Sequence, residues 1–65
     1  MYAKYVKLRE TKGVRDADVA KATGIFPSVF TDWKNGDSTP KVDKLIKIAD
    51  YFGISLDELV REQEL

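Results

Sequence analysis

The sequence predicts an all-α protein, a compact bundle of five short helices that forms a single domain over residues 1–65. Apolar residues recur at intervals of three and four positions, as on one face of a helix, and no segment has the pattern of a strand. All four glycines fall where a predicted helix ends. Both prolines fall where a predicted helix begins, since a missing N–H costs little in the first turn.

The first two helices are expected over residues 2–12 and 16–23. Tyr5 and Leu8 lie one turn apart on the first helix, which places both toward a core. On the second helix, Val19 and Ala20 are expected to face inward, with Thr23 as a further candidate. A glycine follows each helix and can adopt the left-handed conformation that commonly ends one.

The third helix is expected over residues 27–35 and has two chemically different faces. Phe30 and Trp33 belong to an apolar stripe that should face the core, and for Trp33 we favour this over an exposed stacking role. The other face carries short side chains that can donate or accept hydrogen bonds, as readout of base edges requires: Ser28, Thr31, Asp32 and Asn35. Because a short turn separates this helix from the second, the two form a predicted helix-turn-helix.

The fourth helix is expected over residues 40–52, with Thr39 as N-cap and Pro40 as its first residue. It has the clearest amphipathic pattern in the chain, with an inward stripe of Val42, Leu45, Ile48, Ala49 and Phe52. The fifth helix is expected over residues 56–62, after a capping box that begins at Ser55. Residues 63–65 are expected to fray.

Composition limits the chemistry that this chain can perform. It has no cysteine and no histidine, so thiolate and imidazole metal ligands are missing, and no phosphate-binding loop or nucleophile–base pair is present. We therefore expect no enzyme activity, no metal, no cofactor and no small-molecule ligand. No apolar run approaches ~18 residues, so we expect a cytoplasmic protein with no membrane partner.

Charge is unevenly distributed although the formal sum is zero, with 11 basic and 11 acidic residues. Residues 1–47 carry 10 Lys/Arg against 6 Asp/Glu, a difference of +4, whereas residues 48–65 carry 1 against 5, a difference of −4. The first part can therefore attract phosphates that the second part repels.

From Tyr5 to Val60 the order of helices and residues resembles the Cro/C1-type helix-turn-helix domain of phage repressors and bacterial transcriptional regulators. The resemblance is carried by the joint spacing of Leu8, Lys12-Gly13, Val19-Ala20, Thr23-Gly24-Ile25, Phe30, Trp33-Lys34-Asn35-Gly36, Pro40, Leu45, Ile48-Ala49 and Phe52-Gly53-Ile54-Ser55-Leu56-Asp57-Glu58-Leu59. It implies a lambda-repressor-like fold and a sequence-specific regulator of repressor type, with the third helix in the major groove of double-stranded DNA.

Carried over position by position, the resemblance implies two sets of site residues. The base-reading candidates are Pro27, Ser28, Thr31 and Asp32. The phosphate-contacting candidates are Arg15, Lys34, Asn35, Ser38, Thr39 and Lys41, whereas Lys44 and Lys47 are expected to form a solvated face. One recognition helix covers few bases, so we expect a homodimer on a palindromic operator, paired through the C-terminal helix with Val60 and Leu65 in the interface. The protein would then be nucleoid-associated, in a bacterium or a phage-infected cell.

Three positions depart from the family pattern. Arg15 replaces a capping Ser or Thr and could add a phosphate contact, whereas Asp16 replaces a common glutamine and should repel phosphate. Phe26 replaces a serine before the recognition helix; we favour packing over the turn, and the alternative is contact with a thymine methyl. Asp32 could accept a hydrogen bond from cytosine, or it could be a solvated surface acid. These acids and the zero net charge support an alternative function, an antitoxin-like or anti-repressor module that binds a protein.

Overall fold

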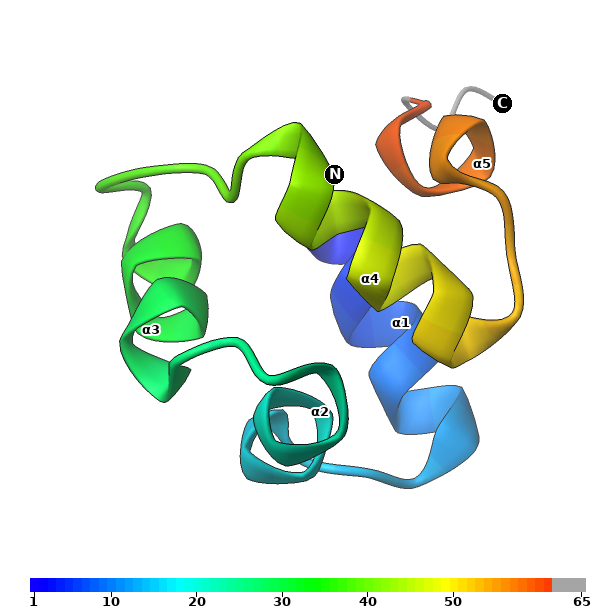
Figure 1. Ribbon diagram of the computed structural model, residues 1–65, viewed down its shortest axis with the longest axis horizontal. Coiled ribbons are helices and arrows are strands. Elements are labelled where there is room, and N and C mark those ends of the chain that lie inside the picture. The colour runs from blue at the N-terminus through cyan, green and yellow to red at the C-terminus, as the bar shows by residue number, and fades with distance from the viewer. Residues whose placement is uncertain (62–65) are drawn as a thin grey trace.

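The computed structural model describes residues 1–61, which form five α-helices and no strand. They are α1 (Tyr2–Lys12), α2 (Asp16–Thr23), α3 (Pro27–Asn35), α4 (Val42–Phe52) and α5 (Leu56–Val60), as Figure 1 shows. The predicted all-α fold is confirmed, and the first three helices have the predicted bounds. A glycine in the left-handed conformation follows each of the first four helices, as predicted.

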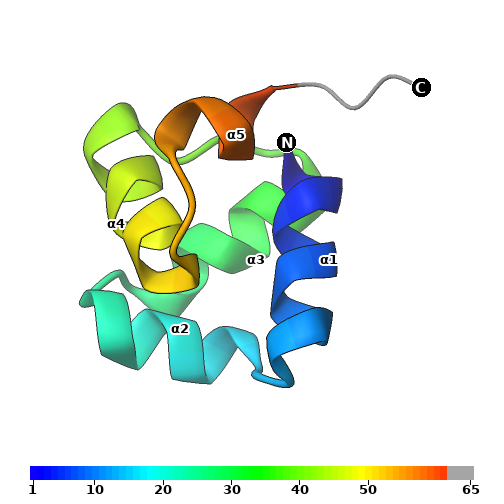
Figure 2. The same ribbon diagram turned by 90° about the vertical axis from the view of Figure 1, so that its right-hand side faces the viewer.

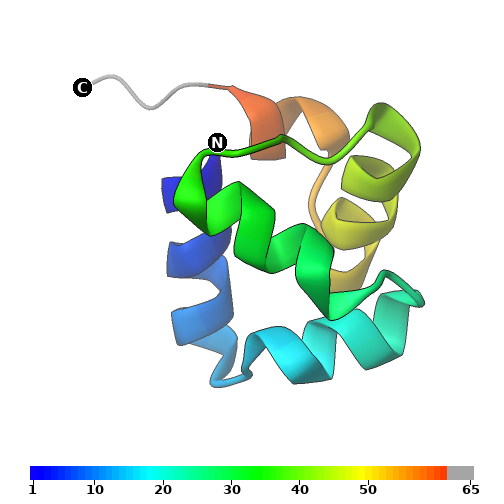
Figure 3. The same cartoon turned by 90° about the vertical axis from the view of Figure 1, so that its left-hand side faces the viewer.

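The helices are arranged so that α3 covers one side of the bundle. α2 packs against α3 and α4, and α5 packs against α4 and α1. Figure 3 shows α3 in front, with α1 and α4 at either side of it, α2 below and α5 above. Figure 2 shows the opposite side, where α1 and α4 flank the segment that joins α4 to α5 and α3 lies behind.

Tyr5 of α1 lies at the centre of the core and is fully buried. Its ring centroid lies 5.5 Å from that of Phe30 and 5.1 Å from that of Trp33, both on α3. The Trp33 ring also meets the ring of Tyr2 edge-on at 5.3 Å. Offset and edge-to-face ring pairs add to the stabilisation that burial alone provides. Aromatic contacts with α1 therefore fix the rotation of α3 about its own axis.

The hydroxyl of Tyr5 links α1 to the start of α2. It donates a hydrogen bond of 2.5 Å to Asp16 Oδ1, and Arg9 Nε lies 3.3 Å from the same oxygen. Burial, followed by the hydrogen bond to Asp16, raises the pKa of Tyr5 far above its ordinary value. Tyr5 therefore stays protonated and keeps its hydrogen in this link.

The start of the fourth helix differs from the prediction. α4 begins at Val42, its N-cap is Lys41 in an extended conformation, and Thr39 does not cap it. Pro40 is buried in the preceding loop and is not the first helical residue. With the loop anchored at Pro40, the helix starts two residues later, and Val42 is 60% exposed and does not belong to the buried stripe. Leu45, Ile48 and Ala49 are buried as predicted.

The fifth helix is shorter than predicted, ending at Val60, and Arg61 is extended with φ −67 and ψ 130. Its predicted start is confirmed, because Ser55 Oγ accepts a hydrogen bond of 3.0 Å from the Glu58 N–H. The expectations for residues 62–65, including Leu65, lie outside the described residues.

Candidate nucleic-acid interface

The turn between α2 and α3 is anchored on both sides. Gly24 ends α2 with φ +77 and donates to the Ala20 carbonyl at 2.9 Å, and a side chain at this φ would be strained. Thr23 Oγ1 donates to the Val19 carbonyl at 2.7 Å, which ties the last turn of α2 together. Ile25 is buried in the core directly after the glycine. The turn therefore holds α3 in a defined position relative to α2.

The inward face of α3 is as predicted. Phe30 is fully buried and Trp33 is 6% exposed, so the prediction that Trp33 belongs to the core is confirmed. With these two residues held by the rings of α1, the opposite side of the helix must face outward. Ser28 and Thr31, which are both exposed, lie there.

The four base-reading candidates all lie on α3, in its first two turns. Pro27, Ser28 and Thr31 are exposed, whereas Asp32 is half-buried. The Asp32 carbonyl accepts from the Asp37 N–H at 2.9 Å and so belongs to the helix end, while its carboxylate forms no ion pair within residues 1–61. These residues form a ridge with two hydroxyls and one carboxylate, which can exchange hydrogen bonds with base edges.

The six phosphate-contacting candidates are all exposed. Arg15 is the N-cap of α2, and Lys34 and Asn35 are the last two residues of α3. Ser38, Thr39 and Lys41 lie in the loop before α4. Because α4 starts at Val42, the positive end of its dipole lies beside Lys41 and not beside Thr39. No side chain caps this helix end, and the Lys44 N–H donates to the Lys41 carbonyl at 3.0 Å.

The position of Phe26 differs from the prediction. The prediction that its ring packs over the turn is wrong, because Phe26 is 76% exposed, more than any other large apolar residue described. It is the extended N-cap of α3, with φ −64 and ψ 139, and stands beside the base-reading candidate Pro27. The alternative left open by the sequence, contact with a thymine methyl, needs an exposed ring and agrees with this position.

Asp16 has a role that its position on α2 alone did not reveal. Its carboxylate accepts from the Tyr5 hydroxyl and pairs with Arg9, and both partners come from α1. The Arg9 guanidinium offsets part of the negative charge that was expected to repel phosphate. The spacing of eleven residues between Tyr5 and Asp16 has no helical period, so only the packing of α1 against α2 reveals this contact.

Other kinds of site find no support in the part of the chain that the structure describes. No group of three or more metal-ligating side chains gathers within residues 1–61. None of the described helices has both the length and the hydropathy that crossing a bilayer requires.

Comparison with known proteins gives one family and two relatives. The family model described as helix-turn-helix matches residues 7–59. A cryptic phage CTXphi transcriptional repressor, RstR, of Vibrio cholerae is 26% identical over 57 residues, which is 88% of this chain and 51% of that protein. The crystal structure of a transcriptional regulator from Listeria innocua superposes with a TM-score of 0.75 at 28% identity, covering 100% of this chain and 63% of that one. The chain thus spans about half the length of the curated relative.

Proposed function

The chain belongs to the helix-turn-helix family of Cro/C1 type, and on that premise we propose that it is a sequence-specific DNA-binding transcriptional regulator of repressor type. This family consists of DNA-binding regulators and is not an enzyme family. The Vibrio cholerae relative is a transcriptional repressor, which supports the same direction of regulation for this chain.

The observation that carries the proposal is the opposition of the two faces of α3. Phe30 and Trp33 are buried, and Ser28 and Thr31 are exposed. In the proposed complex α3 enters the major groove, and its outward hydroxyls and the Asp32 carboxylate meet base edges. Phe26 lies at the N-terminal end of this face, where its ring would meet a thymine methyl.

The exposed residues around α3 position it on the duplex. Arg15, Lys34 and Lys41 supply positive charge, and Asn35, Ser38 and Thr39 supply hydrogen bonds to phosphate oxygens. Only three cations take part, so affinity should fall with salt less steeply than for a strongly basic protein. The net charge of zero therefore agrees with a small phosphate footprint and does not by itself favour the alternative of a protein-binding module.

We propose a homodimer on a palindromic operator, because one helix reads too few base pairs for useful specificity. The half-sites would then lie ~34 Å apart, one turn of the duplex. α5 remains the proposed interface, although Leu59 is fully buried and Val60 half-buried against the chain's own core. The contact between two copies would therefore use the exposed side of this short helix.

The test is selection from random duplexes at low salt, followed by sequencing. We expect an enriched motif with two-fold symmetry, and weaker binding of that motif by Ser28→Ala and Thr31→Ala. The matched control is Lys47→Ala, an exposed residue outside both candidate sets, which should bind like the parent. If no motif is enriched, DNA readout is wrong, and a tight protein partner found in addition would favour the protein-binding role. A motif bound equally by all variants would show that the readout residues are wrongly assigned.

A further inference from the structure

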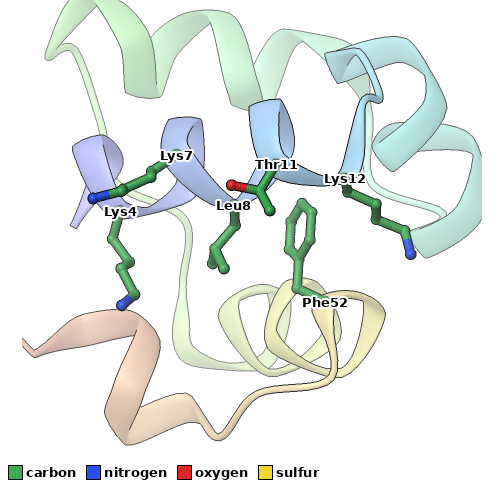
Figure 4. Close-up of a pocket in the computed structure, with 6 residues that line it drawn as sticks. All are labelled: Lys4, Lys7, Leu8, Thr11, Lys12 and Phe52. Carbon is green, nitrogen blue, oxygen red and sulfur yellow. The ribbon is translucent and has the colours of Figure 1, made fainter.

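A groove of about 320 Å³ lies between α1 and the end of α4. Figure 4 shows its lining, which is Lys4, Lys7, Leu8, Thr11, Lys12 and Phe52. Figure 2 shows α1, α4 and the segment joining α4 to α5 on the side of the bundle where α3 lies behind them, whereas α3 lies in front in Figure 3. The groove therefore opens away from the candidate nucleic-acid interface.

The floor of the groove is apolar. Leu8 extends from α1 and Phe52 from α4 into the space between the two helices, as Figure 4 shows. Both side chains are half-buried and pack against the core with their inner sides, which leaves their outer sides in the groove. A bulky apolar side chain of a partner would remove this surface from water.

The rim of the groove is cationic. Lys4, Lys7 and Lys12 line it, and no carboxylate does. The Lys4 ammonium lies 3.9 Å from Glu58 at one end, and the Lys12 ammonium lies 5.2 Å from the centre of the Tyr51 ring. Lys7 is exposed and forms no ion pair within residues 1–61. Because the whole chain is neutral, overall basicity does not explain this concentration of lysines around an apolar floor.

We propose that this groove binds an acidic peptide segment of a partner protein, in which one leucine- or phenylalanine-sized side chain is flanked by aspartates or glutamates. The apolar side chain enters between Leu8 and Phe52, and the flanking carboxylates meet the three lysines of the rim. This occupant is chosen by charge complementarity, since three lysines and no carboxylate line the groove. The duplex proposed to lie against α3 is on the far side and does not compete for it.

Two functional consequences follow from the position of the groove. A partner bound there leaves α3 uncovered, so the partner and DNA bind at the same time. The groove therefore serves recruitment of a second protein to the chain and not displacement of DNA from it. Peptide binding does not depend on the proposed function, because its readout requires no DNA.

The experiment uses the whole chain, labelled with ¹⁵N, and a synthetic peptide in which one leucine is flanked by glutamates. We expect amide shifts confined to α1 and to the region around Phe52, with affinity that decreases as salt is added. Lys7→Glu should weaken binding about tenfold, because it removes one attraction and adds a repulsion. The matched control Lys47→Glu changes the same charge at an exposed position outside the groove and should leave peptide affinity unchanged.

Four results would overturn the proposal. The first is the absence of peptide binding, and the second is an equal loss of affinity in Lys7→Glu and Lys47→Glu, which indicates non-specific attraction. The third is Lys7-dependent binding of anionic phospholipid vesicles without binding of the peptide. The fourth is retention of full affinity when the peptide leucine is replaced by serine, which would show that the floor takes no part. A selected duplex added to the peptide-saturated protein should bind undiminished.

Discussion

The inward face of α3 is held by rings that belong to α1, whereas the side chains on its outward face are exposed. Phe30 and Trp33 contact Tyr5 at 5.5 Å and 5.1 Å between ring centroids, while Ser28 and Thr31 face solvent. The direction of the candidate readout face is thus decided by residues that would never touch DNA. Changes on the inward face should alter folding, and changes on the outward face should alter binding alone.

The largest expected effect comes from truncation of the inward face. Trp33→Ala should lower the free energy of unfolding by about 3–5 kcal/mol, the usual cost of removing a buried aromatic side chain. Urea unfolding followed by circular dichroism measures it, with the exposed Thr31→Ala as control, expected within about 0.5 kcal/mol of the parent. A small domain has little stability to lose, so the milder Phe30→Leu provides a variant that remains folded. Equal stability of Trp33→Ala and Thr31→Ala would contradict the two-faced description.

The support of the inward face can be weakened without creating a large cavity. Tyr5→Phe removes only the hydroxyl that donates to Asp16. Hydrogen bonds to charged groups contribute about 1.5–3 kcal/mol, and the lower end applies because Asp16 is partly exposed and keeps its pairing with Arg9. Chemical unfolding near neutral pH measures the loss. A variant as stable as the parent would show that this hydroxyl does not link α1 to α2 in solution.

The same hydroxyl predicts how stability depends on pH. The pKa of Tyr5 is raised from 10.0 by burial first and by Asp16 second, so the folded chain keeps a proton that the unfolded chain loses. This contribution is fully present below pH 10 and decreases as pH rises above it, by about 1.4 kcal/mol for each pH unit. Unfolding measured at increasing alkaline pH should show a steeper loss for the parent than for Tyr5→Phe. Parallel pH profiles would contradict the assignment.

The two prolines, Pro27 and Pro40, show where a helix start can be predicted from the sequence and where it cannot. Pro27 is the first residue of α3, as predicted, and it is exposed. Pro40 is buried before α4, which begins two residues later. Both positions satisfy the same local preference of proline for the first turn. Tertiary burial of Pro40 decides the difference, and no local pattern contains that information.

Only part of the candidate site was predictable from the sequence, as was true of the helix starts. The i, i+3 pair of Phe30 and Trp33 indicated which side of α3 faces inward, and burial confirms it. Exposure of Phe26 was not predictable, because a preference for burial is only a tendency for an aromatic residue beside a turn. The contact between Tyr5 and Asp16 depends on how two helices pack, so the period of neither helix reveals it. Sequence periods therefore gave the faces of helices, and packing gave the contacts between them.

The smallest expected effect concerns the outward face and tests whether the exposed ring of Phe26 reads a base. Replacing thymine by uracil in the selected duplex deletes only a methyl group, so a contact with Phe26 should cost about 0.8 kcal/mol, roughly fourfold in affinity. In Phe26→Ala the thymine and uracil duplexes should bind equally, and stability should stay within about 0.5 kcal/mol of the parent. Val42→Ala is the matched control, since Val42 is also exposed but lies at the start of α4. If Phe26→Ala still prefers thymine as strongly as the parent does, the ring reads no methyl group, even though the chain binds DNA.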